Sequence, residues 1–187
     1  RCGRAHHRRD RKGLPHSRPL SPRKGEGAHA SAVKGCAFTG HRSSFEGIDA
    51  EKLKERIASL AEEGFDTFYC GMALGFDLLC CEILVSLKTE CPVKIVACVP
   101  CADQSARYPY EMRRLYEDLL RECDEKIVLH EHYEEGCMFE RNRRMGDECD
   151  VLFAYLRSNR GGTRYTVSYA LKKGKKVVYF ENKEDKT

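Results

Sequence analysis

Short apolar runs alternate with amphipathic helical patterns along this chain from residue 33 to residue 180. Each run has the length of a strand, and the segments between the runs repeat their apolar residues at helical spacing. Such alternation is typical of parallel strands joined by right-handed helical crossovers. The sequence therefore predicts an α/β fold, a three-layer Rossmann-like fold with a mainly parallel sheet of about six strands. The strands are expected at Val33–Phe38, Thr67–Cys70, Val93–Val99, Lys126–Leu129, Val151–Leu156 and Lys176–Phe180.

Local signals mark the ends of several elements between these strands. Asp49 is placed to cap a helix that Gly64 ends, and Gly174 marks the end of the last helix. Pro109 suits the first turn of a further helix, because proline needs no N–H partner there. The segment Pro100–Tyr108 before it is expected to be a loop.

Positive charge is concentrated at the start of the chain. Residues 1–34 carry ten Lys and Arg against two acidic residues, a formal net charge of +8, and few large apolar side chains. We expect residues 1–32 to form a disordered basic tail, or an extension that is not native to the protein, and residues 33–187 to form one domain. Residues 35–187 carry 23 basic and 27 acidic residues, a net charge of −4, so nucleic acid is not an expected partner of the folded domain.

The chain holds eleven cysteines, and several of them fall in apolar runs. Free thiols behave there as small buried hydrophobes in a reducing compartment, which predicts a cytoplasmic protein. Cys98 and Cys101 form a CxxC pair, but a lone pair is weak support for a metal or redox role, and we expect no metal. No apolar run is long enough to span a membrane.

Polar and glycine clusters follow four of the predicted strands, at Thr39–Arg42, Gly71–Asp77, Pro100–Arg107 and Gly161–Thr163. Ligands of a parallel α/β sheet bind beyond the carboxyl ends of its strands, where these clusters meet. Each glycine taken singly is explained by a tight turn. Four clusters at one edge favour a binding site.

Two features indicate phosphate binding. Gly161, Gly162 and Thr163 lead directly into a helical pattern, so free backbone N–H groups at the helix start can bind an anion. Arg141 and Asn142 share a helical face with Met138 and Met145. Burying a guanidinium without a partner is costly, so this face either turns to solvent or waits for an anion.

The neighbouring turns offer further contacts. Asp77 either accepts hydrogen bonds from ribose hydroxyls or caps its own helix, and both alternatives remain open. Gly71 and Gly75 allow close approach of the backbone. Glu82 lies about 140° around the helix from Asp77, so the two do not form a catalytic pair. His41 and Arg42 are either anion contacts or a solvated loop pair, and the adjoining Thr39 and Gly40 favour contacts.

Five motifs in this order resemble the YpsA-like family of the SLOG superfamily, which is related to the lonely guy phosphoribohydrolases and to the Rossmann-like core of DprA. They are TGHR at 39–42, GMALGFD at 71–77, PCADQ at 100–104, GCMFERNRRM at 136–145 and GGTRYTV at 161–167. The resemblance implies a Rossmann-like domain that binds a nucleotide or a nucleotide derivative of the NAD or ADP-ribose type.

The same resemblance bears on catalysis. In the lonely guy enzymes, a helical arginine and a glutamate after the glycine turn are associated with cleavage of an N-glycosidic bond. Arg141 matches the arginine, but the turn is shorter than the enzymes' GGxGTxxE pattern and Thr166 stands where the glutamate is sought. Catalytic residues stay unassigned, with Asp77, Glu82 and Arg141 as candidates.

The sequence thus favours a nucleotide-binding regulatory or sensor protein over an enzyme. The first alternative is a phosphoribohydrolase-like N-glycosidase that acts on a nucleotide, and the second is a protein-interaction scaffold. The expected partners are a small nucleotide ligand and either a protein partner or a second copy of the chain, with no certain cofactor. The predicted ligand contacts are Thr39, Gly40, His41, Arg42, Gly71, Gly75, Asp77, Gln104, Arg141, Asn142, Gly161, Gly162, Thr163 and Thr166.

Overall fold

The computed structural model describes residues 33–42 and 47–181 of the chain. The tail expected at residues 1–32 lies outside these ranges and stays a prediction. The fold below is that of the unit that begins at Ala32.

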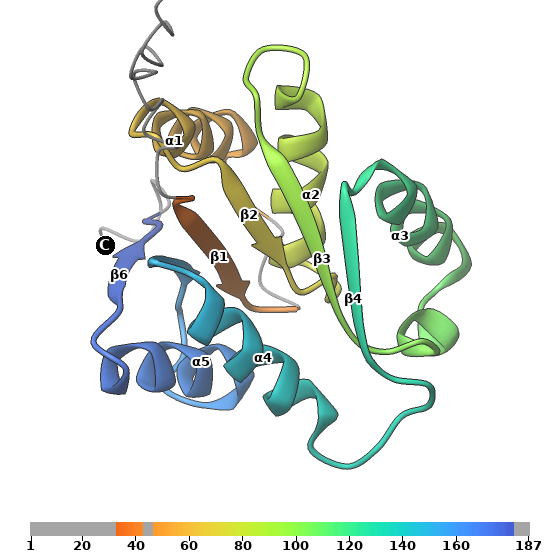
Figure 1. The fold of residues 1–187 in the computed structure, drawn as a ribbon. Helices are drawn as coiled ribbons and strands as arrows, with labels where there is room; N and C mark the ends of the chain where they lie inside the picture. Colours follow the sequence, from red (N-terminus) through yellow and green to blue (C-terminus); the bar gives the residue numbers. More distant parts are fainter. Residues whose placement is uncertain (1–32, 43–46, 182–187) are drawn as a thin grey trace, which may run out of the picture. The chain divides into compact units, whose positions relative to one another are not determined.

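Six strands form one sheet in the order β4-β3-β2-β1-β5-β6, and every neighbouring pair is parallel (Figure 1). This confirms the predicted α/β Rossmann-like class with its parallel sheet. The strands are β1 Gly35–Gly40, β2 Thr67–Cys70, β3 Lys94–Cys101, β4 Glu125–His130, β5 Val151–Tyr155 and β6 Lys176–Tyr179.

Helices cover both faces of the sheet, which makes the predicted three layers (Figure 1). On one face, α1, α2 and α3 pack over the larger apolar core, which includes Leu53, Phe76 and Tyr116. On the other face, α4 and α5 enclose a smaller core around Met145 and Val167. The helices are α1 Ala50–Glu62, α2 Phe76–Leu87, α3 Tyr110–Glu122, α4 Cys137–Glu148 and α5 Gly161–Lys172.

Local predictions succeed where the signal is local. The Asp49 side chain accepts a hydrogen bond from the Lys52 backbone N–H at 3.0 Å, as expected of the cap of α1. The prediction that Pro100–Tyr108 is a loop is wrong for two parts of the segment. Strand β3 continues past Pro100 to Cys101, because Cys101 pairs with His130 of β4. A short 3-10 helix occupies Gln104–Arg107.

The strand order creates a switch point beside β1. The chain moves from β1 outward through β2 and β3 to β4, and then returns to place β5 on the other side of β1. Connections after β1 and β5 therefore leave in opposite directions and open a crevice at the carboxyl ends of these two strands, the usual ligand position in such sheets. Thr39 lies beside Ala154, and Gly40 beside Tyr155, at this edge.

The cysteines of the described residues are all free thiols, and most are buried. Cys98 and Cys101 lie three residues apart in β3, so their side chains leave opposite faces of the sheet. The CxxC pair therefore does not bring two sulfurs to one metal or to each other. Among the residues that the structure describes, no group of three or more His, Cys, Asp and Glu is arranged to hold a metal ion, and no helix is long and apolar enough to cross a membrane.

Candidate functional site

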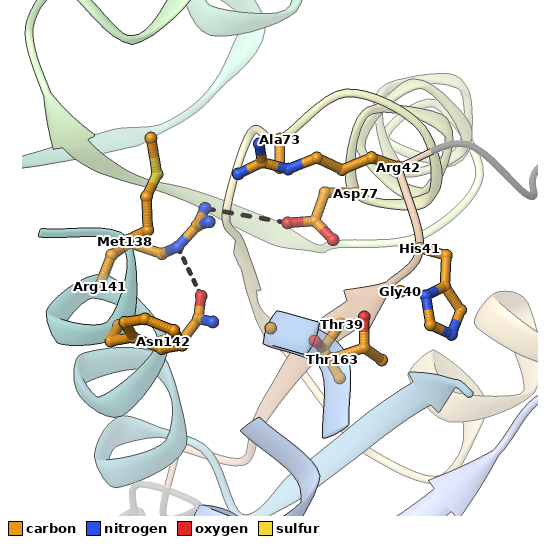
Figure 2. A pocket seen from close by; sticks show the side chains of 12 residues that line it. Thr39, Gly40, His41, Arg42, Ala73, Asp77, Met138, Arg141, Asn142 and Thr163 are labelled. Carbon is orange, nitrogen blue, oxygen red and sulfur yellow. Dashed lines mark hydrogen bonds and ion pairs between the residues drawn. The ribbon is translucent and has the colours of Figure 1, made fainter. Parts of the chain in front are cut away.

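A pocket of about 260 Å³ opens at the carboxyl edge of the sheet, at the switch point between β1 and β5 (Figure 2). Segments distant in the sequence meet there: the ends of β1 and β2, one face of α4 and the first turn of α5. Three of the four predicted clusters contribute to its wall. The lining residues are Thr39, Gly40, His41, Arg42, Ala73, Asp77, Met138, Phe139, Arg141, Asn142, Gly162 and Thr163.

Arg141 and Asp77 face each other in this pocket (Figure 2). Arg141 Nη1 lies 3.8 Å from Asp77 Oδ2, and the side chains are only 4% and 8% exposed. The guanidinium also donates to the Gly71 carbonyl, and its Nε donates to Asn142 Oδ1 at 2.9 Å. The guanidinium is therefore buried beside a carboxylate that the fold supplies from a helix 64 positions earlier in the sequence, and it also lines the pocket.

Burial raises the pKa of Asp77 to about 6. The charges of Arg141 and Arg42 and hydrogen bonds with the backbone of Ala73 and Gly40 act in the opposite direction, but they offset only part of the desolvation. Asp77 is thus a buried carboxyl group whose charge changes near neutral pH. The helix-capping alternative for Asp77 is wrong, because α2 has Gly75 at its N-cap position and no side-chain cap.

Two glycines make this close arrangement possible. A Cβ atom at Gly71 would overlap the Arg141 guanidinium, so any side chain there would displace the cation. Gly75 has a φ of +86°, and a Cβ there would lie 2.7 Å from the carbonyl oxygens of His41 and Arg42. The close approach at Gly71 therefore makes room for Arg141 and Asp77, and the close approach at Gly75 lets the turn after β2 pack against the turn after β1. Neither glycine is among the residues that line the pocket.

His41 and Arg42 follow β1 and differ in their surroundings. His41 Nε2 accepts a hydrogen bond from the Arg157 backbone N–H at 2.9 Å. Burial, and then the charge of Arg157, lower the pKa of His41, so the imidazole is neutral at physiological pH. Arg42 is exposed at the pocket wall, and its guanidinium forms no hydrogen bond or ion pair with any residue that the structure describes.

The first turn of α5 lines the pocket through Gly162 and Thr163. Thr163 lies below Arg42 in the view of Figure 2. No side chain caps this helix, so the N–H groups of its first turn have no side-chain acceptor at the cap position. Thr166 is not part of the wall: it is buried, and its hydroxyl donates to the Gly162 carbonyl at 2.8 Å. A threonine one turn into a helix commonly bonds its own backbone in this way.

Other predicted site residues are also placed differently. Glu82 is exposed on α2 and does not line the pocket. Gly161 does not line the pocket, although the next residue does, and its φ is +86°. Ala73 and Phe139 also line the pocket; they lie within the motifs at 71–77 and 136–145 but were not among the predicted contacts. Met138 lines it as well, and its helical spacing with Arg141 was a usable signal.

Gln104 lies behind the pocket and supports it. Its Nε2 donates to the carbonyls of Gly71 and Met72, at 3.3 Å and 2.9 Å. Met72 has a φ of +55°, a conformation that non-glycine residues rarely adopt. Gln104 therefore stabilises the β2–α2 turn, and the Gly71 carbonyl accepts from both Gln104 and Arg141.

The parallel sheet and the polar pocket at its switch point define a Rossmann-like α/β protein whose candidate ligand site lies at the carboxyl edge. Residues 36–182 match the family model described as the YspA SLOG family. The chain belongs to this family, the YpsA branch of the SLOG proteins.

Curated relatives include two bacterial proteins. The UPF0398 protein of Bacillus pumilus is 30% identical over 127 residues, which cover 66% of this chain and 68% of that protein. A UPF0398 protein of Bacillus licheniformis is 27% identical over 124 residues, which cover 64% of this chain and 68% of the relative.

Similar solved structures come from the DNA processing protein A group. The Streptococcus pneumoniae protein matches with a TM-score of 0.59 at 21% identity, over 80% of this chain and 51% of its own. The Helicobacter pylori protein, described for its single-stranded DNA binding mode, matches with a TM-score of 0.58 at 19% identity, over 80% of this chain and 66% of its own. The chain thus spans about half to two thirds of these proteins, and the likeness shows the fold.

Proposed function

We propose that this protein binds a nucleotide or a nucleotide derivative through its phosphate and acts as a regulatory or sensor protein. The observation that carries the proposal is the meeting of an uncapped helix start at Gly162 and Thr163 with the cation of Arg42 around one pocket. Backbone N–H groups at a helix start and a guanidinium are the groups that proteins use for phosphate. The free thiols of the core are consistent with action in the cytoplasm.

The charge of the folded part favours a small ligand over DNA. Residues 35–187 have a formal net charge of −4, whereas binding along a phosphate backbone needs a basic surface. The DNA binding described for the Helicobacter pylori protein is therefore not extended to this chain.

A thermal-shift panel of AMP, ADP, NAD and ADP-ribose tests the proposal. We expect at least one of these compounds to raise the melting temperature. We expect Arg42→Ala to weaken its binding by about 10- to 100-fold, since one charge-assisted contact is worth about 1.5–3 kcal/mol. Arg56→Ala, which removes an exposed arginine from α1, should leave binding unchanged. Absence of any shift across the panel would contradict the proposal.

Asp77 favours a second candidate function, the N-glycosidase. Its carboxyl group lines the pocket and has a pKa raised to about 6, which suits a group that takes up or releases a proton near neutral pH. Asp77 shares the pocket with Arg141, so it could take the place of the glutamate that is missing after the glycine turn.

Chromatography after incubation of the protein with nucleoside monophosphates, NAD and ADP-ribose decides this second candidate. If it holds, free base accumulates, and Asp77→Asn lowers the rate by about 100-fold or more, the usual effect of losing a general acid or base. Glu82→Gln is the matched control, because that carboxylate is exposed outside the pocket. Equal release by wild type and Asp77→Asn would show that Asp77 is not the catalytic group.

A further inference from the structure

A second pocket of about 280 Å³ adjoins the first, and Arg42 and Met138 line both. It lies where the 3-10 helix after β3 and the segment before α4 meet, so it uses the fourth predicted cluster, which the first pocket leaves out. Gln104, Arg107, Tyr108 and Tyr133 belong to its wall. A ligand in the first pocket that reaches past Arg42 would enter this second one.

The wall of the second pocket offers surfaces that suit a planar ring. Tyr133 is 62% exposed, and Tyr108 and Met138 add further apolar surface. The guanidinium of Arg107 is exposed and, like that of Arg42, forms no hydrogen bond or ion pair with the described part of the chain. Aromatic rings and guanidinium planes are the groups on which proteins stack nucleobases.

Gln104 supplies an independent observation. This side chain is only 7% exposed, and its Oε1 has no hydrogen-bond partner among the described residues. Exchanging the amide oxygen and nitrogen of Gln104 does not give a better arrangement, because Nε2 already donates to the Gly71 and Met72 carbonyls. A buried acceptor without a donor is costly, and Oε1 is closed off from solvent in the unliganded structure. A ligand whose N–H group reaches Oε1 as the side chain adjusts therefore gains affinity.

We infer that the second pocket is a nucleobase subsite, selective for a base with an exocyclic amino group that donates to Gln104 Oε1. The phosphate and sugar of the same ligand would occupy the first pocket, with Arg42 at the junction. This inference rests on the proposed binding function. It adds to that function the class of ligand, an amino-bearing nucleotide such as an adenine nucleotide.

Calorimetric titration of the whole chain with ribose 5-phosphate, AMP and IMP tests the inference. AMP is expected to bind about ten-fold or more tightly than ribose 5-phosphate, because a stacked base contributes about 1–3 kcal/mol. AMP should also bind about ten-fold more tightly than IMP, whose keto oxygen would face the Gln104 oxygen in place of an N–H donor.

Variants locate the effect in the second pocket. In Tyr133→Ala and in Arg107→Ala, the ratio of AMP to ribose 5-phosphate affinity should fall toward one. Tyr110→Ala and Arg114→Ala remove an exposed tyrosine and an exposed arginine of α3 that line neither pocket, and the ratio should stay at the wild-type value.

The outcomes separate the two proposals. If ribose 5-phosphate binds but AMP binds no more tightly, or if both pocket variants keep the wild-type ratio, the base subsite is wrong and the phosphate site stands. Equal affinities for AMP and IMP would overturn the selectivity for an amino group. If none of the three compounds binds, the proposed function fails together with the inference.

Discussion

Replacing Arg141 with methionine is expected to lower the free energy of unfolding by about 3–5 kcal/mol at pH 7. The substitution keeps much of the side-chain volume but leaves the Asp77 carboxylate buried without its cation, and the Gly71 carbonyl without that donor. Urea denaturation followed by circular dichroism measures the effect. The loss should shrink below pH 6, where Asp77 takes up a proton.

Two further variants show whether the pairing causes this loss. Arg144→Met, on the same helix, breaks only an exposed ion pair with Glu148 and should cost less than about 1 kcal/mol. Adding Asp77→Asn to Arg141→Met should recover a large part of the stability, because the unpaired charge is then gone. An Arg141→Met protein as stable as wild type would contradict the view that the two residues depend on each other. This is also why Arg42, rather than Arg141, is the better variant for testing ligand binding.

Asp77→Asn alone is expected to stabilise the protein by about 1–3 kcal/mol at pH 7, since each unit of pKa shift corresponds to about 1.4 kcal/mol. The folded pKa of about 6 lies above the ordinary value of 3.8, so the native state binds the proton more tightly than the unfolded chain. In the wild type, the stabilisation that comes from protonated Asp77 is complete below pH 3.8 and is lost as the pH rises through about 6. The stability difference between variant and wild type, from urea titrations at pH 4 to 8, should therefore grow with pH.

The same substitution should change the affinity for a phosphorylated ligand. At pH 7.5 the ionised Asp77 offsets the charge of Arg141, so we expect Asp77→Asn to bind AMP about ten-fold more tightly than wild type, the effect of one nearby charge. The ratio should fall to about one at pH 5, where Asp77 is protonated in the wild type. Using a ratio at each pH cancels the ionisation of the phosphate and of His41, which both proteins share. A ratio that does not change with pH would contradict the titration of Asp77 in this range.

If both results hold, Asp77 lowers stability and opposes anion binding at neutral pH, yet it stands in the wall of the pocket. A residue with these two costs is expected at a functional site rather than in a purely structural one. The N-glycosidase test then decides whether its role is proton transfer or the adjustment of ligand affinity by pH.

Much of the fold follows from local sequence. The bounds of β2 agree with the predicted Thr67–Cys70, and Asp49 caps α1, because chain direction, apolar periodicity and capping depend on residues close together in sequence. The edge of the sheet that holds the site also follows, since βαβ connections bring the carboxyl ends of all parallel strands to one side. The extent of β3 was misjudged at Pro100, because pairing with β4 decides where that strand ends.

The pairing within the site required the tertiary structure. Periodicity shows that Arg141 shares a helical face with methionines, but it does not show which group of another element meets that face. Strand order and helix packing bring Asp77 to Arg141, and they leave Thr166 turned to its own helix and Glu82 in solvent. The sequence by itself determined which residue types gather at the carboxyl edge. Only the tertiary structure decided which of them are paired with each other and which, like Arg42, line the pocket without an ion pair in the described part of the chain, because burial and the distance between charges are properties of the packed chain.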